Sequence, residues 1–170
     1  STLDLSGKPV FFNLGGAGDT DTILNVTATT GGVKIAADLS SVQLTNADSS
    51  LKKDDVIVLA TKLTKDSTVT ADKWSTGRKK FLLSIDGSRN LLATLSGISS
   101  FVEATNDYLN SAAPGNINIR NGGAYLDWLL TQPYADGVGM QVIEDYFTAI
   151  TETLSPSDGY SEFQRWHGAY

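Results

Sequence analysis

The chain has 170 residues and a formal net charge of −6 at pH 7, with no cysteine and a single histidine, His167. A chain of this length can bury its own core, and its composition excludes disulfides, thiolate metal ligands, cysteine nucleophiles and histidine clusters. We expect no cofactor, and the acidic balance argues against nucleic acid as the main partner because phosphate backbones bind many Lys and Arg side chains.

Short segments with strand character fill the first half of the chain. Residues 9–14 form an apolar run that ends at glycines, and apolar and polar residues alternate over 33–39. Residues 56–60 are continuously apolar, as in a strand covered on both faces, and alternation over 81–85 closes the series. The spacing predicts an antiparallel sheet, a sandwich or a small barrel over about residues 9–86.

The second half has the period of a helix. Between Ser88 and Asn110 the spacing predicts an amphipathic helix that begins at an N-cap, Ser88. One narrow stripe of this helix contains Leu91, Leu95, Ile98, Val102, Thr105 and Leu109. Further helices are predicted over 124–131 and 142–154, and a short one in the tail after Ser155.

Strands followed by helices are typical of an α+β fold. We expect the β-rich part at 1–86 to pack with a helical part at about 88–154 around a single core. No linker or internal repeat interrupts the chain, so residues 1–170 are predicted to form a single domain, mainly helical over 87–170. No apolar run approaches the roughly 20 residues that span a bilayer, so we expect no membrane partner.

The segment from Gly15 to Asp21 is rich in glycine and aspartate but matches no nucleotide motif. A dinucleotide fingerprint requires glycine where Asp21 stands, and a phosphate loop requires a lysine followed by Ser or Thr. The segment is predicted to be a hairpin loop. A single calcium site at Asp19 and Asp21 is the alternative interpretation.

Residues for bond-breaking chemistry are few. His167 is the only imidazole, and no nucleophile elbow is present. A small hydrolase would have to use a pair of carboxylates, most of them on predicted solvent faces. The candidates are Glu103, Asp107, Asp127, Glu144, Asp145 and Glu152.

Two segments are candidates for an interface. One is the basic run Arg78, Lys79 and Lys80, which can bind an anion or protect a strand edge. The other is the aromatic tail, whose rings must be covered by this chain or by a neighbouring subunit. Its members are Tyr160, Phe163, Trp166 and Tyr170. Residues 1–89 carry 11 basic and 10 acidic side chains and residues 90–170 carry 2 and 9, so copies could also associate head to tail.

The segment from Asn25 to Gly32, rich in Thr, Gly and Asn in a chain without cysteine, resembles bacteriophage virion structural proteins as a broad class. The resemblance covers the first half and transfers no functional residue. It implies a non-enzymatic structural or assembly protein, such as a capsid decoration, head-accessory or tail component. Its partners would be copies of itself and other virion proteins, and it would be assembled into the virion in the host cytoplasm.

The alternative function is a carbohydrate- or ligand-binding module. Loop aromatics such as Trp74, Tyr134 and Trp166 would then stack on the ligand. The alternative location is that of a cytoplasmic or secreted soluble protein.

Overall fold

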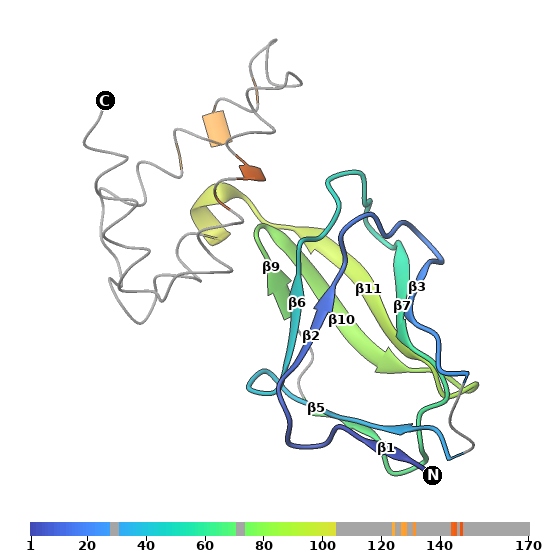
Figure 1. Ribbon diagram of the computed structural model, residues 1–170. Helices are drawn as coiled ribbons and strands as arrows, with labels where there is room; N and C mark the ends of the chain where they lie inside the picture. Colours follow the sequence, from blue (N-terminus) through green and yellow to red (C-terminus); the bar gives the residue numbers. More distant parts are fainter. Residues whose placement is uncertain are drawn as a thin grey trace. The chain divides into compact units, whose positions relative to one another are not determined.

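A computed structural model (Figure 1) describes residues 1–27, 31–70 and 74–104 and a few later positions. The later positions are Ala124, Asp127, Trp128, Thr131, Glu144, Asp145 and Phe147. The chain divides into two compact units, residues 1–98 and residues 99–170, and each is described by itself. The single domain expected from the sequence stays a prediction. No helix among the described residues is long and apolar enough to cross a membrane.

The first unit consists of short strands joined by turns. The strands are β1 (Leu3–Asp4), β2 (Val10–Asn13), β3 (Thr22–Leu24), β4 (Val33–Lys34), β5 (Ala36–Ala37), β6 (Val42–Thr45), β7 (Val56–Ala60), β8 (Thr68–Val69), β9 (Trp74–Thr76), β10 (Lys79–Ile85) and β11 (Leu91–Ile98). The predicted strand segments at 9–14, 33–39, 56–60 and 81–85 are therefore strands, although the pairing differs from the prediction.

The first half winds as a coil. Leu3 pairs in parallel with Val33, and Val33 forms a parallel bridge with Leu63. β2 pairs in parallel with β6, β3 with β7 and β5 with β8, each strand meeting one that lies 32 to 36 residues further on. The chain therefore makes two turns, the first through β1, β2 and β3 and the second through β4 to β7. In Figure 1 the first turn follows three sides of this unit.

Residues 63–98, the rest of the first unit, pack against one end of the coil. The five-stranded sheet has the order β3-β7-β11-β10-β9, in which β7, β11, β10 and β9 are antiparallel. The predicted antiparallel sheet is therefore wrong for the first two turns and correct only for this part. A parallel pair needs a long connection, which here is the remainder of each turn.

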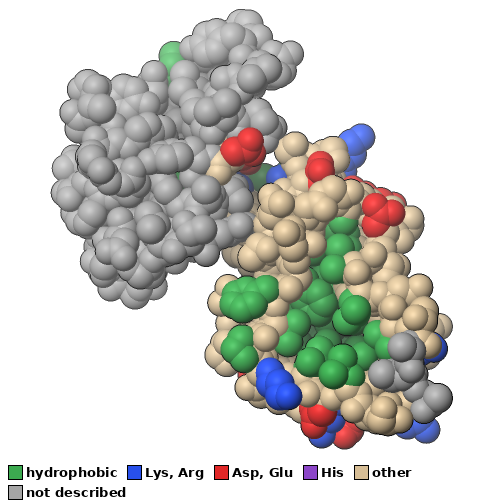
Figure 2. Space-filling view, in the orientation of Figure 1, with side chains coloured by type: hydrophobic (Ala, Val, Ile, Leu, Met, Phe, Trp, Pro, Cys, Tyr) green, Lys and Arg blue, Asp and Glu red, His purple; other side chains and the backbone are tan. Residues whose placement is uncertain are grey.

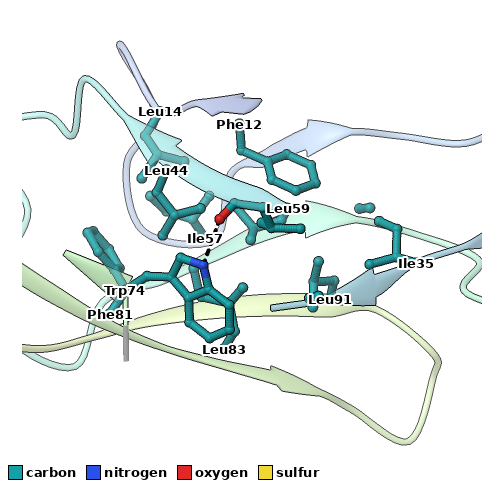
Figure 3. Close-up of a cluster of buried hydrophobic side chains, with 14 of the residues drawn as sticks. Phe12, Leu14, Ile35, Leu44, Ile57, Leu59, Trp74, Phe81, Leu83 and Leu91 are labelled. Carbon is teal, nitrogen blue, oxygen red and sulfur yellow. Dashed lines mark hydrogen bonds between the residues drawn. The ribbon is translucent and has the colours of Figure 1, made fainter. Parts of the chain in front are cut away.

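The inward side chains of all three sides meet in one core (Figure 3). The largest fully buried members of the first unit include Ile35, Ile57, Leu59, Phe81 and Leu91. Trp74 is 3% exposed, and its indole N–H donates to the carbonyl of Val42 at 2.9 Å.

The helix predicted from Ser88 to Asn110 is wrong over residues 88–100 and correct, among the described residues, only over 101–104. Residues 91–98 form β11, which pairs with β10 on one side and β7 on the other. Its buried residues Leu91, Ala93 and Leu95 alternate at the strand period. The longest helical run in the described part of the chain is residues 101–104. The described chain is thus β-rich, and the α+β assignment with a substantial helical part at 88–154 is overturned.

The turn before β11 explains the error. Asp86 begins a hairpin that places β11 beside β10, and its carboxylate accepts hydrogen bonds from the backbone N–H groups of Ser88 and Asn90 at 3.0 and 2.8 Å. Asp-Gly between two apolar runs is a strong hairpin signal. Ser88 therefore lies in a hairpin turn, and the following residues are held as a central strand by partners on both sides.

In the second unit the structure describes residues 99–104 and the seven later positions named above. Phe101 and Phe147 are buried and pack edge to face, with their ring centroids 5.4 Å apart. The described residues at 124, 127, 128, 144, 145 and 147 are helical, while most of the predicted helices 124–131 and 142–154, and the whole tail, lie outside the described residues.

Candidate interaction surface

The three strands of the first turn, β1, β2 and β3, each have one edge without a strand partner among the described residues. We call these three edges together the N-terminal edge. Among the described residues β1 pairs only with β4, β2 only with β6 and β3 only with β7. The second turn is covered from both sides, because residues 63–98 pack on it through β8, β9 and β11. Among the described residues, β1, β2 and β3 therefore present their unpaired edges at the same end of the first unit.

Each strand of the N-terminal edge carries an exposed apolar side chain. The exposed fraction is 45% for Leu3 on β1, 64% for Phe11 on β2 and 36% for Leu24 on β3. Figure 2 shows apolar side chains gathered over this face of the unit, between β2 and the β3–β7 pair. The half-buried core residues Leu5, Val10 and Ile23 also belong to the first turn.

The hydrogen bonds of β2 show which backbone groups are open. The N–H of Val10 donates to Ser41 at 2.7 Å and that of Leu14 donates to Thr45 at 2.8 Å. Because backbone groups alternate in direction along a strand, those of Phe11 and Asn13 point away from β6. β2 thus presents a row of donors and acceptors at the side of an exposed phenylalanine.

Charged side chains at the N-terminal edge are Asp4 on β1 and those in the corners between strands. The corner from β1 to β2 contains Lys8, and the corner from β2 to β3 contains Asp19 and Asp21, all three exposed. Asp19 accepts a hydrogen bond from the N–H of Val56, and Asp21 from that of Gly18, each at 2.8 Å. The glycine-rich segment is therefore a corner of the coil. It is not the predicted hairpin loop, because β2 and β3 are not paired.

The calcium interpretation finds no further ligands. The described residues contain no group of three or more His, Cys, Asp or Glu side chains that could hold a metal ion. In Asp19 and Asp21, one carboxylate oxygen of each already accepts a backbone N–H.

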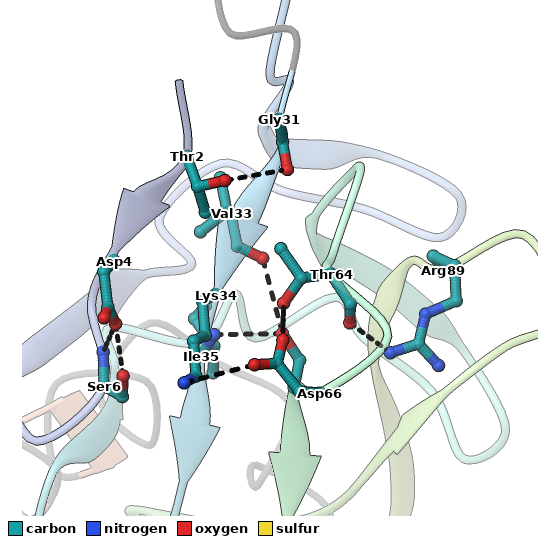
Figure 4. Close-up of polar contacts among 11 residues, drawn as sticks. Thr2, Asp4, Ser6, Gly31, Val33, Lys34, Ile35, Thr64, Asp66 and Arg89 are labelled. Carbon is teal, nitrogen blue, oxygen red and sulfur yellow. Dashed lines mark hydrogen bonds and ion pairs between the residues drawn. The ribbon is translucent and has the colours of Figure 1, made fainter.

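Aspartates followed by serine stabilise several turns. Asp4 accepts hydrogen bonds from the hydroxyl and backbone N–H of Ser6 (Figure 4). Asp38 accepts the same two bonds from Ser40. These side-chain hydrogen bonds hold the pKa of Asp4 and of Asp38 below the ordinary value of 3.8. Their oxygens are used to hold the backbone, which is a structural role.

An ion pair connects β4 to the segment that follows β7. Lys34 lies 3.2 Å from Asp66, and the guanidinium of Arg89 donates to the carbonyl of Thr64 (Figure 4). The hydroxyl of Ser67, which is buried, accepts the N–H of Ile35 at 3.1 Å. These contacts connect the second turn to the chain that follows it.

The structure separates the three residues of the basic run. Arg78 lies in the β9–β10 turn after Gly77, whose φ of 57° suits the first position of a type II′ turn. Lys79 is 7% exposed and lies on the face of β10 that also carries Phe81, whereas Lys80 is half-buried on the opposite face. They do not form one continuous basic surface, and their role in an interface stays a prediction.

The remaining candidates are only partly within the described residues. Trp74 is buried and therefore cannot stack on a ligand. Asp127 accepts the backbone N–H groups of Phe101 and Val102 at 2.7 and 3.1 Å, which is a capping role. Tyr134, Asp107, Glu152 and the four tail aromatics with His167 lie outside the described residues. Glu103, Glu144 and Asp145 lie among the described residues, and their use as catalytic carboxylates stays a prediction.

Sequence reasoning missed the N-terminal edge. β1 lies before residue 9, where the predicted strands begin, and Phe11 lies within a predicted apolar run. The sequence does contain a signal, because Asp4-Leu5-Ser6 recurs as Asp38-Leu39-Ser40. In each triplet the aspartate accepts a hydrogen bond from the backbone N–H of the serine. The first triplet precedes β2 in the first turn of the coil, and the second precedes β6 in the second turn. Comparison with known proteins finds that no family model, no curated protein and no solved structure matches the chain.

Proposed function

We propose that this protein is a non-enzymatic structural component that works by binding other protein chains, and that the N-terminal edge is its contact surface. The observation that supports this proposal is that β1, β2 and β3 each have one strand partner among the described residues and each carry one exposed apolar side chain. Exposed edges with apolar side chains are templates for pairing with another chain.

The physical chemistry favours occupation of this surface. Burying one exposed phenylalanine or leucine fully contributes roughly 1.5 to 3 kcal/mol. The backbone groups of Phe11 and Asn13 that point away from β6 can at the same time form a ladder of hydrogen bonds with an added strand.

The finer proposal is that the assembly is a virion. It is supported by the resemblance of the Thr- and Gly-rich segment from Asn25 to Gly32 to virion structural proteins, which act as many copies in contact with each other. In that setting the chain would serve as a decoration, head-accessory or tail component. The ligand-binding alternative loses one of its three aromatic residues, because Trp74 is part of the core.

Site-specific labelling tests the proposed function. The chain has no cysteine, so Thr22→Cys on β3 creates a unique thiol at the N-terminal edge, and Ser75→Cys on β9 creates an exposed control away from it. Each variant replaces the wild-type chain in the cell or virus that encodes it. A maleimide is then applied to the intact assembly and to the purified chain.

We expect labelling at position 22 to be at least about tenfold slower in the intact assembly than in the purified chain, with no change at position 75. Equal labelling of position 22 in both samples would show that the N-terminal edge is not the contact surface. The nature of the particle in which position 22 is protected decides the virion proposal.

A further inference from the structure

We propose that the occupant of the N-terminal edge is an extended segment of another protein, which pairs with β2, is apolar at its centre and carries lysine or arginine at the end beside Asp19 and Asp21. This inference rests on the proposed function, because it states the chemistry of the partner that the contact surface takes. Three features of the first unit support it, namely the open strand edges, the apolar side chains around β2 and the charges at its two ends.

β2 offers the longest open strand edge in the described part of the first unit. Other strands also have a single strand partner, but β1, β4, β5 and β8 contain two residues each, and β3 and β9 contain three. β6 is as long as β2, yet its second edge faces β9, whose Trp74 donates to the carbonyl of Val42. The outward backbone groups of Phe11 and Asn13 can form a ladder with an added strand. An incoming segment therefore makes the most backbone hydrogen bonds by pairing with β2.

The side chains around β2 favour a segment that is apolar on both of its faces. Phe11 points out of the coil and is 64% exposed, so an apolar residue beside it on the outer face is favoured. On the inner face Val10 is half-buried, and it packs on the core together with Leu5 and Ile23 of the neighbouring sides. Consecutive residues of a strand point to opposite faces and so meet both groups. The segment is thus a continuously apolar run of about four residues, the length of β2.

The charges before β2 balance one another. The charged side chains of residues 1–27, all of them exposed, are Asp4, Lys8, Asp19 and Asp21. Lys8 and Lys34 both attract Asp4, whose carboxylate also accepts hydrogen bonds from Ser6. Lys34 in turn is paired with Asp66 at 3.2 Å. This end of β2 therefore has no excess charge to select a partner.

The corner after β2 is acidic. Asp19 and Asp21 follow β2 with no basic residue among residues 9–27. The second-turn segment that Asp19 contacts through Val56 begins with residues 52–55, which are two lysines followed by two aspartates and add no net charge. A cationic side chain at this end of the incoming segment is attracted, and an anionic one is repelled. The charge of the corner thus determines which end of the segment is basic.

Binding of capped synthetic peptides to the purified full-length chain tests the inference. The probe is a fluorescent peptide with a central run of valine and isoleucine and two lysines at one end, made with the lysines in the first or in the last positions. Its match carries glutamates in place of the lysines. Anisotropy titration measures each dissociation constant, and versions N-methylated at alternate backbone nitrogens test whether the peptide pairs as a strand.

For the wild-type chain we expect the lysine peptide, in the orientation that brings its lysines to Asp19 and Asp21, to bind at least about tenfold more tightly than the glutamate peptide. N-methylation of the nitrogens that face β2 should abolish binding, whereas N-methylation of the other set should not. Phe11→Ser should weaken both peptides at least about fivefold, because it removes the apolar contact and leaves the charges unchanged.

Charge reversal in the chain locates the basic end of the peptide. Asp21→Lys should weaken the lysine peptide at least about tenfold and strengthen the glutamate peptide. The control combines Thr68→Lys and Ser75→Lys, which change the net charge by the same amount at exposed sites on β8 and β9. The control should keep the wild-type preference for the lysine peptide within about threefold. Circular dichroism and thermal unfolding establish that each variant is folded.

Two outcomes would overturn the inference. One is the absence of binding of either lysine peptide at about 1 mM, and the other is binding that Asp21→Lys and the control change equally. If no peptide binds but position 22 is protected in the intact assembly, the edge is covered in another way and the proposed function stands. If the peptide binds as expected but position 22 labels freely in the assembly, the proposed function fails.

Discussion

The indole N–H of Trp74 donates a 2.9 Å hydrogen bond to the backbone carbonyl of Val42, and both residues are buried. This bond connects β9 to the edge of β6 that faces away from β2. It therefore fastens the closing sheet to the second turn of the coil at a place where no strand pairing joins them. A side chain here satisfies a backbone acceptor that a neighbouring strand would otherwise satisfy.

Trp74→Phe tests this connection. We expect the free energy of unfolding to fall by about 2 to 4 kcal/mol, because a buried carbonyl loses its donor and the smaller ring leaves a cavity. Denaturant titration followed by circular dichroism measures the change. Ser75→Ala, at the exposed neighbour on the same strand, should shift stability by less than about 0.5 kcal/mol. An equal effect of both substitutions would contradict the assigned role.

Replacing Gly32 by alanine tests whether the close approach of successive turns of the coil stabilises the fold. Its φ is +79°, and an added Cβ would collide with the backbone carbonyl of Lys62, one turn further along the coil. Gly7 has a similar φ of +73° but open space around its Cβ position. Gly7→Ala should therefore cost only the backbone strain, about 1 to 2 kcal/mol, whereas Gly32→Ala should cost clearly more. Thermal unfolding of both variants measures the difference, and equal losses would show that the close approach is unimportant.

The strands could be predicted from the sequence better than their pairing. Alternation and apolar runs identify residues 56–60 and 81–85 as strands because those signals are local. The parallel pairing of Leu3, Val33 and Leu63 depends on residues about 30 positions apart, which a local period does not contain. Of the N-terminal edge, the apolar Phe11 is visible in the sequence, but the local pattern does not show that Phe11 is exposed while Phe12 is buried.

The segment after Ser88 shows why a clear period can mislead. Leu91, Leu95 and Ile98 fit a helical stripe, yet Leu91, Ala93 and Leu95 also fit a strand. The Asp-Gly turn and two neighbouring strands decided between these patterns, as tertiary context commonly overrides local preference. The helical start lies further on, where Ser100 accepts the N–H of Glu103 at 3.0 Å, and Ser-x-x-Glu is the sequence signature of a capping box.

Asp127 is predicted to hold the start of the helical run 101–104. Its two carboxylate oxygens accept the N–H groups of Phe101 and Val102, which are otherwise orphan donors at a helix start. Asp127→Asn keeps one acceptor but loses the charge, and Asp127→Ala loses both. We expect stability to fall by about 1 kcal/mol for the first and about 2 kcal/mol for the second. Denaturant unfolding checks the order, and an Asn variant as damaging as the Ala variant would mean that the charge, not the acceptor, carries the effect.

The Asp-x-Ser turns predict a loss of stability in acid. Hydrogen bonds from Ser40 and Ser41 lower the pKa of Asp38 in the folded chain below 3.8, so folding favours the charged carboxylate. This stabilisation is complete well above pH 3.8 and disappears as the pH falls through the lowered pKa. Asp38→Asn removes the titrating group but keeps one acceptor oxygen. We therefore expect its melting temperature to lie below that of the wild type at pH 6 and to approach it between pH 4 and pH 2. Ser40→Ala, which retains the carboxylate and removes a hydrogen bond from it, should reduce the wild-type slope in the same range. A melting-temperature difference that is constant from pH 6 to pH 2 would show that the charge of Asp38 does not stabilise the turn.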